Sequence, residues 1–382
     1  MDRKIRMGMV GGGRDAFIGA VHRTAAVLDH QIELVSGAFS SDPDRSRASG
    51  ADLFLPAERC YGDFEEMMRA ESELPPGEAM DFVAIVTPNH LHAPVAHAAL
   101  EAGFHVMSDK PMTRTLEEAE RLTAAVEGSG RLFGLTHNYT GYPMVKEARE
   151  RVRRGDLGTI RKVVVEYPQG WLAARLEASG QKQADWRTDP ERAGISCCMG
   201  DIGTHAENLA EYVTGLRIEA LCADLSTFVD GRPLDDDGSV LLRFAGGARG
   251  VLYASQVSVD EENALALRVY GEKGGLEWHQ EEPNTLLVKH LDRPREIVRT
   301  AGQGLSDVAQ AATRLPAGHP EGFLEAFANL YTAFAHGIRA HANYPSSVQL
   351  DVPSVHDGLR GMQFIQAVVD SSNSEQKWWP MP

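Results

Sequence analysis

The sequence predicts an α/β protein with two domains: an N-terminal doubly wound parallel sheet and a C-terminal α/β domain with a largely antiparallel, open sheet. In the first part of the chain, short apolar runs alternate with segments of helical pattern, which is typical of parallel sheets covered by helices. After Tyr142-Pro143, several runs of strand-like pattern are separated by glycine-rich turns, which is typical of antiparallel sheets. We therefore divide the chain into residues 1–143 and 144–382.

In the first domain, the run Phe82–Thr87 is apolar without interruption, as in a parallel strand buried on both faces. Ligands of such sheets bind beyond the carboxyl ends of the strands. The glycine turn after the first strand, Thr87-Pro88-Asn89 and Lys110 all fall at such ends. The other expected strands are 6–10, 31–39, 105–108 and 132–136, and the expected helices are 20–28, 93–102 and 116–129.

The second domain begins with a charged amphipathic helix over residues 145–154, which ends at Gly155, and a strand of alternating pattern over 160–167. The tail, residues 371–382, is polar until Trp378-Trp379, and we expect it to pack on the surface or on a partner. Further strands are expected at 221–228, 239–244, 248–258, 264–271 and 285–289, and late helices at 323–339 and 355–369.

Composition excludes several functional classes. The 382 residues carry a formal net charge of −16, which disfavours nucleic acids and anionic membranes as partners. No run approaches the roughly 20 apolar residues of a membrane span, and the N-terminus leads into a strand without a signal-like apolar region, so we expect a cytoplasmic protein. The four cysteines form no Cys-x-x-Cys pair, and we interpret adjacent Cys197 and Cys198 as small buried residues. The acidic turn 235–237 is interpreted as solvated rather than as a metal site.

A glycine-rich turn, Gly11-Gly12-Gly13, lies between the first strand and the first helix. This strand–turn–helix context predicts a dinucleotide site, in which Gly11 permits the tight turn and Gly13 lets the backbone approach a pyrophosphate at the helix N-terminus. The next glycine is Gly19, so the turn is longer than in the usual G-x-G-x-x-G pattern. Phe17 and Ile18, which precede Gly19, are also predicted to contact the cofactor.

The end of the second strand decides between NAD and NADP, because an acidic residue there binds the ribose hydroxyls of NAD. Ser40 occupies the expected acidic position. Ser40, Ser41 and Arg45 are the predicted contacts, and Arg45 with Ser40 could hold a 2′-phosphate, whereas Asp42 and Asp44 would repel one. We predict NAD as the cofactor, with NADP possible.

Asp201 and His205 are four residues apart, which on a helix places both side chains on one face. A histidine beside a carboxylate can accept and return a proton near neutral pH. Lys110, after the fourth strand, adds a positive charge that can polarise an oxygen atom. We predict these three residues to be catalytic at an alcohol–ketone site. The alternatives are a structural pair and a pair of metal ligands, and since no convincing third ligand lies nearby, we predict no metal.

Several further residues are candidates, each with ordinary packing as the alternative. Asn89 and His92 are expected at the nicotinamide ribose, whereas His22 is expected to pack within the first helix. Aromatic side chains can stack on sugar faces, and an arginine can bind an anionic group. The additional cofactor candidates are Thr87, Pro88 and Asp109, and the substrate candidates besides Asp201 and His205 are Tyr139, Trp171, Trp186, Arg187 and His319.

The sequence resembles the Gfo/Idh/MocA oxidoreductases over essentially its whole length. The matching pieces are the glycine turn with Gly19-Ala20-Val21-His22, Thr87-Pro88-Asn89 with His92, Asp109-Lys110-Pro111 in place of Glu-Lys-Pro, Gly200–His205 with its Asp-x-x-x-His pattern, and Tyr270–Gly274. The resemblance implies an N-terminal Rossmann domain and a C-terminal domain for substrate binding and oligomerisation. It also implies carbohydrate substrates and a homodimer or homotetramer.

The expected reaction is hydride transfer between NAD(P) and a hydroxyl of a sugar, polyol or glycoside. His205 would remove the hydroxyl proton, Lys110 would bind the reacting oxygen, and Asp201 would hold a neighbouring hydroxyl or Lys110 itself. The main alternative is an NAD-dependent glycoside hydrolase that works by transient oxidation, elimination, hydration and re-reduction, with Tyr139, His137 or His319 as a second base. A binding protein that senses the cofactor without catalysis is a third possibility.

Overall fold

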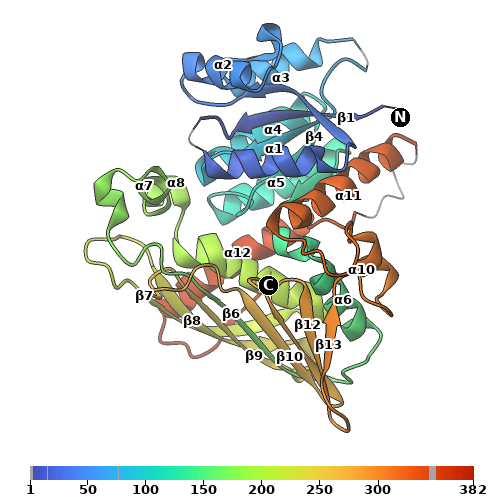
Figure 1. Cartoon of the computed structure of the whole chain (residues 1–382). Coiled ribbons are helices and arrows are strands. Elements are labelled where there is room, and N and C mark those ends of the chain that lie inside the picture. The colour runs from blue at the N-terminus through green and yellow to red at the C-terminus, as the bar shows by residue number, and fades with distance from the viewer. Residues whose placement is uncertain (1–2, 15, 76, 344–349) are drawn as a thin grey trace. The chain divides into compact units, whose positions relative to one another are not determined.

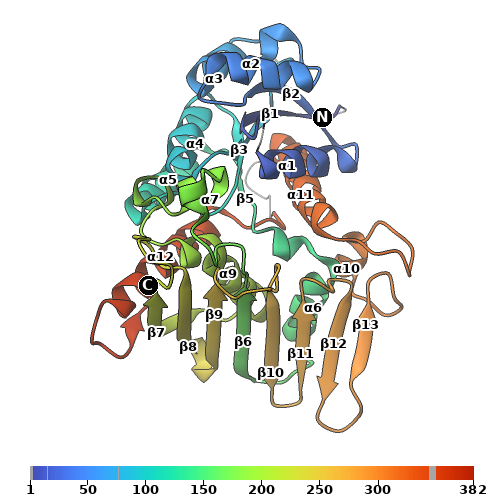
Figure 2. The ribbon, with the colours of Figure 1, turned by 60° about the vertical axis from the view of Figure 1, so that its left-hand side comes forward.

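The structure, a computed structural model, describes residues 3–14, 16–75, 77–343 and 350–382. By packing, the chain forms two compact units. The first unit contains Met1–Asn138 and Phe323–Leu359, and the second contains Tyr139–Gly322 and Arg360–Pro382. Each unit is built on one sheet, and the ribbon of both is drawn in Figures 1 and 2. Among the helices of the described ranges, none combines the length and the apolar character that a membrane crossing needs.

The sheet of the first unit is parallel throughout, with the strand order β2-β1-β3-β4-β5, which confirms the predicted doubly wound sheet. Because all strands run the same way, the residues that follow them emerge at one edge. The order reverses at β1, which lies between β2 and β3, and ligands of such sheets bind at this point. The strands are β1 (Ile5–Gly11), β2 (Ile32–Ala38), β3 (Phe82–Val86), β4 (His105–Ser108) and β5 (Phe133–Leu135).

Six helices of the described residues belong to the first unit: α1 (Phe17–Leu28), α2 (Pro43–Asp52), α3 (Phe64–Ser72), α4 (His92–Glu101), α5 (Leu116–Ser129) and α11 (Phe323–Asn343). The sequence analysis predicted neither α2 nor α3. Their starts do have a local signal, because the side chains of Asp42 and Asp63 accept hydrogen bonds from the backbone N–H groups of Arg45 and Glu66. Thr115 caps α5 in the same way.

Helix α11 returns to the first sheet from far along the sequence. Ile5, Met7 and Met9 of β1 share one apolar cluster with side chains of α1 and α11. Within this cluster, His22 Nδ1 lies 2.7 Å from the hydroxyl of Tyr331, so His22 packs as expected. The packing units therefore differ from the contiguous division at residues 143 and 144, because α11 buries its apolar face on the first sheet.

The second sheet has nine strands in the order β13-β12-β11-β10-β6-β9-β8-β7-β14, and only the β6–β9 pair is parallel. This confirms the predicted, largely antiparallel sheet, whose strands lie side by side in Figure 2. The strands are β6 (Ile160–Pro168), β7 (Ile218–Ser226), β8 (Asp237–Phe244), β9 (Arg249–Ser255), β10 (Ala266–Gly271), β11 (Gly274–His279), β12 (Thr285–His290), β13 (Glu296–Arg299) and β14 (Trp379–Pro380).

Three strands, β11, β13 and β14, were not predicted. β11 opens with two glycines, β13 has charged ends, and β14 has two residues, so none shows a clear alternating pattern. The tail packs on its own unit, since β14 pairs with β7 and the guanidinium of Arg243 lies 3.7 Å from the ring centre of Trp378.

Helices α6 (Pro143–Arg153) and α9 (Thr204–Thr214) contact strands of the second sheet, and a π-helical turn (Met199–Gly203) leads into α9. The other helices described here are α7 (Lys182–Arg187), α8 (Pro190–Ala193), α10 (Asp307–Ala311) and α12 (Val355–Ser372).

The interpretation of residues 235–237 as a solvated turn was wrong, because Asp235 is 8% exposed and Asp236 is fully buried. Both carboxylates accept hydrogen bonds from backbone N–H groups, which replace the lost water.

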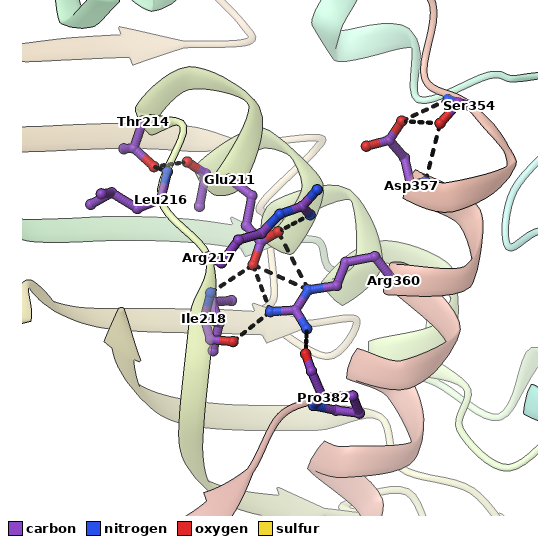
Figure 3. A network of polar contacts seen from close by, with 10 residues as sticks. Glu211, Thr214, Leu216, Arg217, Ile218, Ser354, Asp357, Arg360 and Pro382 are labelled. Atoms are coloured by element: carbon purple, nitrogen blue, oxygen red, sulfur yellow. Dashed lines mark hydrogen bonds and ion pairs between the residues drawn. The ribbon is translucent and has the colours of Figure 1, made fainter. Parts of the chain in front are cut away.

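A buried ion pair joins α9 to α12, as Figure 3 shows. The carboxylate of Glu211 accepts hydrogen bonds from Arg360 Nη2 at 2.9 Å, from Arg217 Nη1 at 2.6 Å and from the backbone N–H of Ile218 at 2.7 Å. Arg360 also donates to the carbonyl oxygen of Pro382 at 2.7 Å. The network therefore holds together the end of α9, the start of β7 and the tail.

Replacing Arg360 by alanine should destabilise the protein strongly. The change leaves the buried carboxylate of Glu211 without its buried partner, which costs about 3 kcal/mol, the lower end of the range for a broken buried pair, because Arg217 remains. Denaturant unfolding of the full chain measures the loss. The control is Arg153→Ala, which breaks the ion pair with Glu150 on an exposed part of α6 and should leave the unfolding midpoint unchanged. Equal midpoints for the two variants would contradict this account.

Candidate active site

The glycine turn lies at the carboxyl end of β1. Gly11 and Gly12 have φ values of +83° and +70°, a conformation that suits glycine. A Cβ on Gly12 would lie 2.8 Å from the Cα of Gly19, so this pair lets α1 pack closely on the turn. A Cβ on Gly13 would lie 2.7 Å from the carbonyl oxygen of Phe39, so a side chain is excluded there by the loop after β2, and the predicted approach of a pyrophosphate to Gly13 stays a prediction.

The N-terminus of α1 has features of an anion site. In the described part of this turn, no side chain caps the helix at Ala16 and no acidic residue lies in its first turn. Its first N–H groups therefore remain available to a pyrophosphate, in contrast to the capped helices α2, α3 and α5. Of the two predicted contacts here, Phe17 is 70% exposed and Ile18 packs partly on the apolar cluster.

The loop after β2 carries the residues predicted to choose the cofactor. β2 ends at Ala38, and Ser40 is half-buried, with its hydroxyl accepting the N–H of Asp42 at 3.2 Å. Asp42 is committed to capping α2, whereas Ser41 is exposed. Arg45 is exposed and donates to the carbonyl oxygen of Arg14, so its guanidinium lies against the residue that follows the glycine turn.

His92 connects the loops that follow β3 and β4. Its ring nitrogens lie 2.9 Å from the carbonyl oxygen of Thr87 and 2.8 Å from that of Pro111. Burial lowers the pKa of His92 and so favours the neutral ring, which donates to one of the two carbonyl oxygens at a time. The predicted cofactor contacts Pro88 and Asn89 lie on the first of these loops, and Asn89 is buried. The arrangement favours a supporting role for His92.

Asp109 orders the loop that carries Lys110. Its carboxylate accepts hydrogen bonds from the backbone N–H of Lys110 at 2.9 Å and from the hydroxyl of Thr136 at 3.0 Å. The side chain of Lys110 is half-buried.

Two buried polar atoms at this edge have no hydrogen-bond partner within the described residues. They are Oγ1 of Thr87, after β3, and Nδ2 of Asn138, after β5. Buried polar atoms are normally paired, so these two indicate a ligand with polar groups of its own. Together with the uncapped α1 and the glycine cradle, they fit a dinucleotide such as NAD. The sequence analysis did not select Asn138, although its position at the carboxyl edge was a usable signal.

Asp201 lies in the π-helical turn and His205 in the first turn of α9. The spacing predicted that the two residues share one regular α-helix, and this was wrong. The backbone around Asp201 is a π-helical turn, which is wound more widely than an α-helix. The carboxylate of Asp201 accepts hydrogen bonds from Arg187 Nε at 3.2 Å and from Gln256 Nε2 at 2.9 Å. Two fixed donors thus hold this carboxylate.

His205 is 6% exposed and packs edge-on against Tyr139, with 4.8 Å between the ring centres. The hydroxyl of Tyr139 is hydrogen-bonded to that of Tyr167, and Asn263 contacts both hydroxyls. Burial raises the pKa of Tyr139, so the phenol stays protonated. The structure therefore brings the predicted residues Tyr139 and His205 together, whereas Tyr167 and Asn263 were not predicted.

Three further predicted residues gather at Asp201. The guanidinium of Arg187 lies 4.2 Å from the ring centre of Trp186 and 5.9 Å from that of Trp171, besides its bond to Asp201. His319 is exposed, and its ring lies 3.1 Å from the carbonyl oxygen of Pro316. This contact of His319 is local, to a residue three positions earlier in the chain. Among the residues that the structure describes, no group of three His, Cys, Asp or Glu side chains is arranged to hold a metal ion.

Two family models match successive parts of the chain. Residues 5–152 match an oxidoreductase family with an NAD-binding Rossmann fold, and residues 145–277 match the GFO/IDH/MocA C-terminal domain. The match confirms NAD as the predicted cofactor and the Rossmann domain that holds it.

Individual proteins agree with these models. The chain is 33% identical to the uncharacterised oxidoreductase YfiI of Bacillus subtilis over 99% of this chain and 97% of that protein. It is 29% identical to levoglucosan dehydrogenase of Pseudarthrobacter phenanthrenivorans over 75% and 76% of the two chains. An inositol dehydrogenase homologue of Azotobacter vinelandii, in complex with NADH and myo-inositol, is 35% identical and matches over 100% of this chain and 98% of that chain with a TM-score of 0.93. The chain belongs to the Gfo/Idh/MocA family of NAD-binding oxidoreductases.

Proposed function

We propose that this protein is an NAD-dependent dehydrogenase that oxidises a hydroxyl group of a sugar, polyol or glycoside. The observation that carries the proposal is the carboxylate of Asp201, held by Arg187 and Gln256 four residues before the buried His205. The comparisons support the substrate class, because one similar protein binds myo-inositol and another is a levoglucosan dehydrogenase.

Each catalytic candidate has a role in this reaction. NAD, when bound, supplies the hydride acceptor. His205 accepts the proton of the reacting hydroxyl, and the packing of its ring on Tyr139 sets its orientation. Lys110 donates a hydrogen bond to the reacting oxygen and stabilises the negative charge that develops there. Asp201 accepts a hydrogen bond from a neighbouring hydroxyl of the substrate.

The electrostatics near Asp201 favour an uncharged substrate. Arg187 and Asp201 form an ion pair, so the arginine is already compensated and does not call for an anionic group. Trp186 and Trp171, whose rings lie near the same guanidinium, offer apolar faces on which a sugar ring can stack.

The glycoside hydrolase alternative has less support, because it needs a second base. Tyr139 lies at His205 but its pKa is raised by burial, which makes it a poor base at neutral pH. His319 is exposed, and its ring contacts the carbonyl oxygen of Pro316, three residues earlier. Burial lowers the pKa of His137 to about 3, which makes this histidine a weak base.

A substrate panel tests the proposed function. We expect NAD to be reduced in the presence of at least one compound among myo-inositol, levoglucosan, common sugars, polyols and aryl glycosides. The measurement is NADH absorbance, together with release of the aryl alcohol. Release of the alcohol without net NADH would favour the hydrolase over the dehydrogenase. If no compound of the panel yields NADH or the alcohol, both functions are contradicted.

Replacing His205 by asparagine should lower kcat by about 10²–10⁴-fold, the usual contribution of a general base. Asparagine keeps a polar side chain of similar shape but cannot accept the proton. NADH binding, measured by fluorescence titration, should stay near wild type. The control is His279→Asn, which changes a histidine that is hydrogen-bonded to Glu277 on β11 and should leave kcat unchanged. A His205→Asn enzyme within a few fold of wild type would remove His205 from the mechanism.

The loop after β2 should discriminate only weakly between NAD and NADP. Ser40 cannot repel a 2′-phosphate, so we expect NAD to be favoured by less than about two orders of magnitude, or roughly 2.8 kcal/mol. Ser40→Asp should widen this preference by repulsion, and Arg45→Ala should weaken NADP more than NAD. The ratio of kcat/KM for the two cofactors measures both effects. An unchanged ratio in both variants would show that this loop does not contact the 2′ position.

A further inference from the structure

The buried turn of Asp235 and Asp236 is hydrogen-bonded to the segment that carries Asp201. The carboxylate of Asp235 accepts hydrogen bonds from the backbone N–H groups of Cys197 and Met199, both at 3.1 Å, and from the hydroxyl of Ser196 at 3.0 Å. The N–H of Cys198 donates to the carbonyl oxygen of Asp235 at 3.1 Å. One buried residue thus holds the backbone just before the π-helical turn and at its first residue.

The same turn fixes Gln256, which follows β9 and is fully buried. The backbone N–H of Gln256 donates to the carbonyl oxygen of Asp236 at 2.9 Å. Its side-chain Nε2 donates to Asp201 at 2.9 Å, and its Oε1 accepts from the Sγ of Cys197 at 3.4 Å. Both ends of this amide are therefore engaged, which fixes which end faces the carboxylate.

We propose that Ser196, Cys197, Asp235 and Gln256 form a positioning brace that sets the orientation of the Asp201 carboxylate for substrate binding. The inference rests on the proposed function, in which Asp201 accepts a hydrogen bond from the substrate. The brace residues do not touch the substrate. They act through Asp201: Asp235 accepts the N–H groups of Cys197 and Met199, and Gln256 donates to Asp201 and accepts from Cys197.

The chemistry of the brace requires a neutral amide at position 256. A glutamine donates to Asp201 and accepts from Cys197 at the same time, whereas a carboxylate only accepts. The thiol of Cys197 stays protonated and able to donate, because burial raises its pKa. Among the described residues, the charged and titratable groups that interact electrostatically with Asp201 include Arg187, Cys197, Cys198, Tyr139 and Tyr167, and His205 follows four residues later in the chain.

The substitution Gln256→Glu tests the brace with little change in shape. The new carboxylate removes a donor from Asp201 and places a like charge beside it, which favours the protonated form of Asp201. Because the ionised form is the active one, activity should be lost at a higher pH than in the wild type. We expect kcat to fall at least tenfold and the acid limb of the kcat/KM profile to move upward by about one pH unit or more.

The matched control is Gln366→Glu on α12. The amide of Gln366 donates to Asp370 at 3.0 Å, so the substitution creates the same carboxylate pair at another place in the same unit. Kinetics use the full chain with NAD and the compound of the substrate panel that forms NADH. If Gln256→Glu and Gln366→Glu show the same kcat and pH profile, the brace does not position Asp201.

A second pair of variants tests the brace by hydrogen–deuterium exchange, which needs no substrate. Ser196→Ala removes the hydroxyl that joins Asp235 to the N–H of Gly200, and Ser371→Ala removes a buried hydroxyl that accepts the N–H of Ala223. Hydrogen–deuterium exchange should become faster in residues 197–203 of the first variant and stay at the wild-type rate there in the second.

The two results separate the brace from the proposed function. A wild-type protein that forms no NADH from the panel fails the proposed function, and the exchange experiment then judges the brace alone. Equal exchange of residues 197–203 in Ser196→Ala and wild type would overturn the brace, even if the enzyme is an active dehydrogenase.

Discussion

A buried carboxylate must find hydrogen-bond donors inside the protein, and in this chain the donors are repeatedly backbone N–H groups of nearby loops. Asp235 accepts the N–H groups of Cys197 and Met199, Asp236 accepts those of Phe228 and Val229, and Glu211 accepts that of Ile218. The bonds of Asp235 fix the irregular backbone just before Asp201, and the bond of Glu211 fixes the start of β7. The segment that carries Asp201 is therefore held by a charge that the core has to satisfy.

The two units contribute different chemistry. In its described residues, the first offers a parallel sheet edge with a glycine turn, a helix start without a side-chain cap and the unpaired polar atoms of Thr87 and Asn138, all suited to a dinucleotide. The second offers Asp201 and His205 among aromatic rings and a compensated arginine, which suits an uncharged ring with several hydroxyls. The family of NAD-binding oxidoreductases accounts for the first set, and the proposed substrate class accounts for the second.

Burial changes how several candidates are interpreted. His92, selected as a cofactor contact, has both ring nitrogens against protein carbonyls and joins two loops. The acidic turn at 235–237, interpreted as solvated, lies inside the second unit and connects Asp201 to Gln256. In both cases the polar residue acts on the backbone of neighbours that are distant in sequence, which a local pattern does not reveal.

The sequence by itself determined the features that depend on local pattern. Apolar runs predicted the parallel strands, alternating runs predicted much of the antiparallel sheet, and the glycine turn predicted the NAD-binding domain. Tertiary structure alone decided where α11 packs, that a Cβ on Gly13 would meet the carbonyl oxygen of Phe39, and that Gln256 lies beside Asp201. The physical reason is that hydrogen bonds and close packing join residues far apart in the chain, whereas periodicity and spacing report only on neighbours.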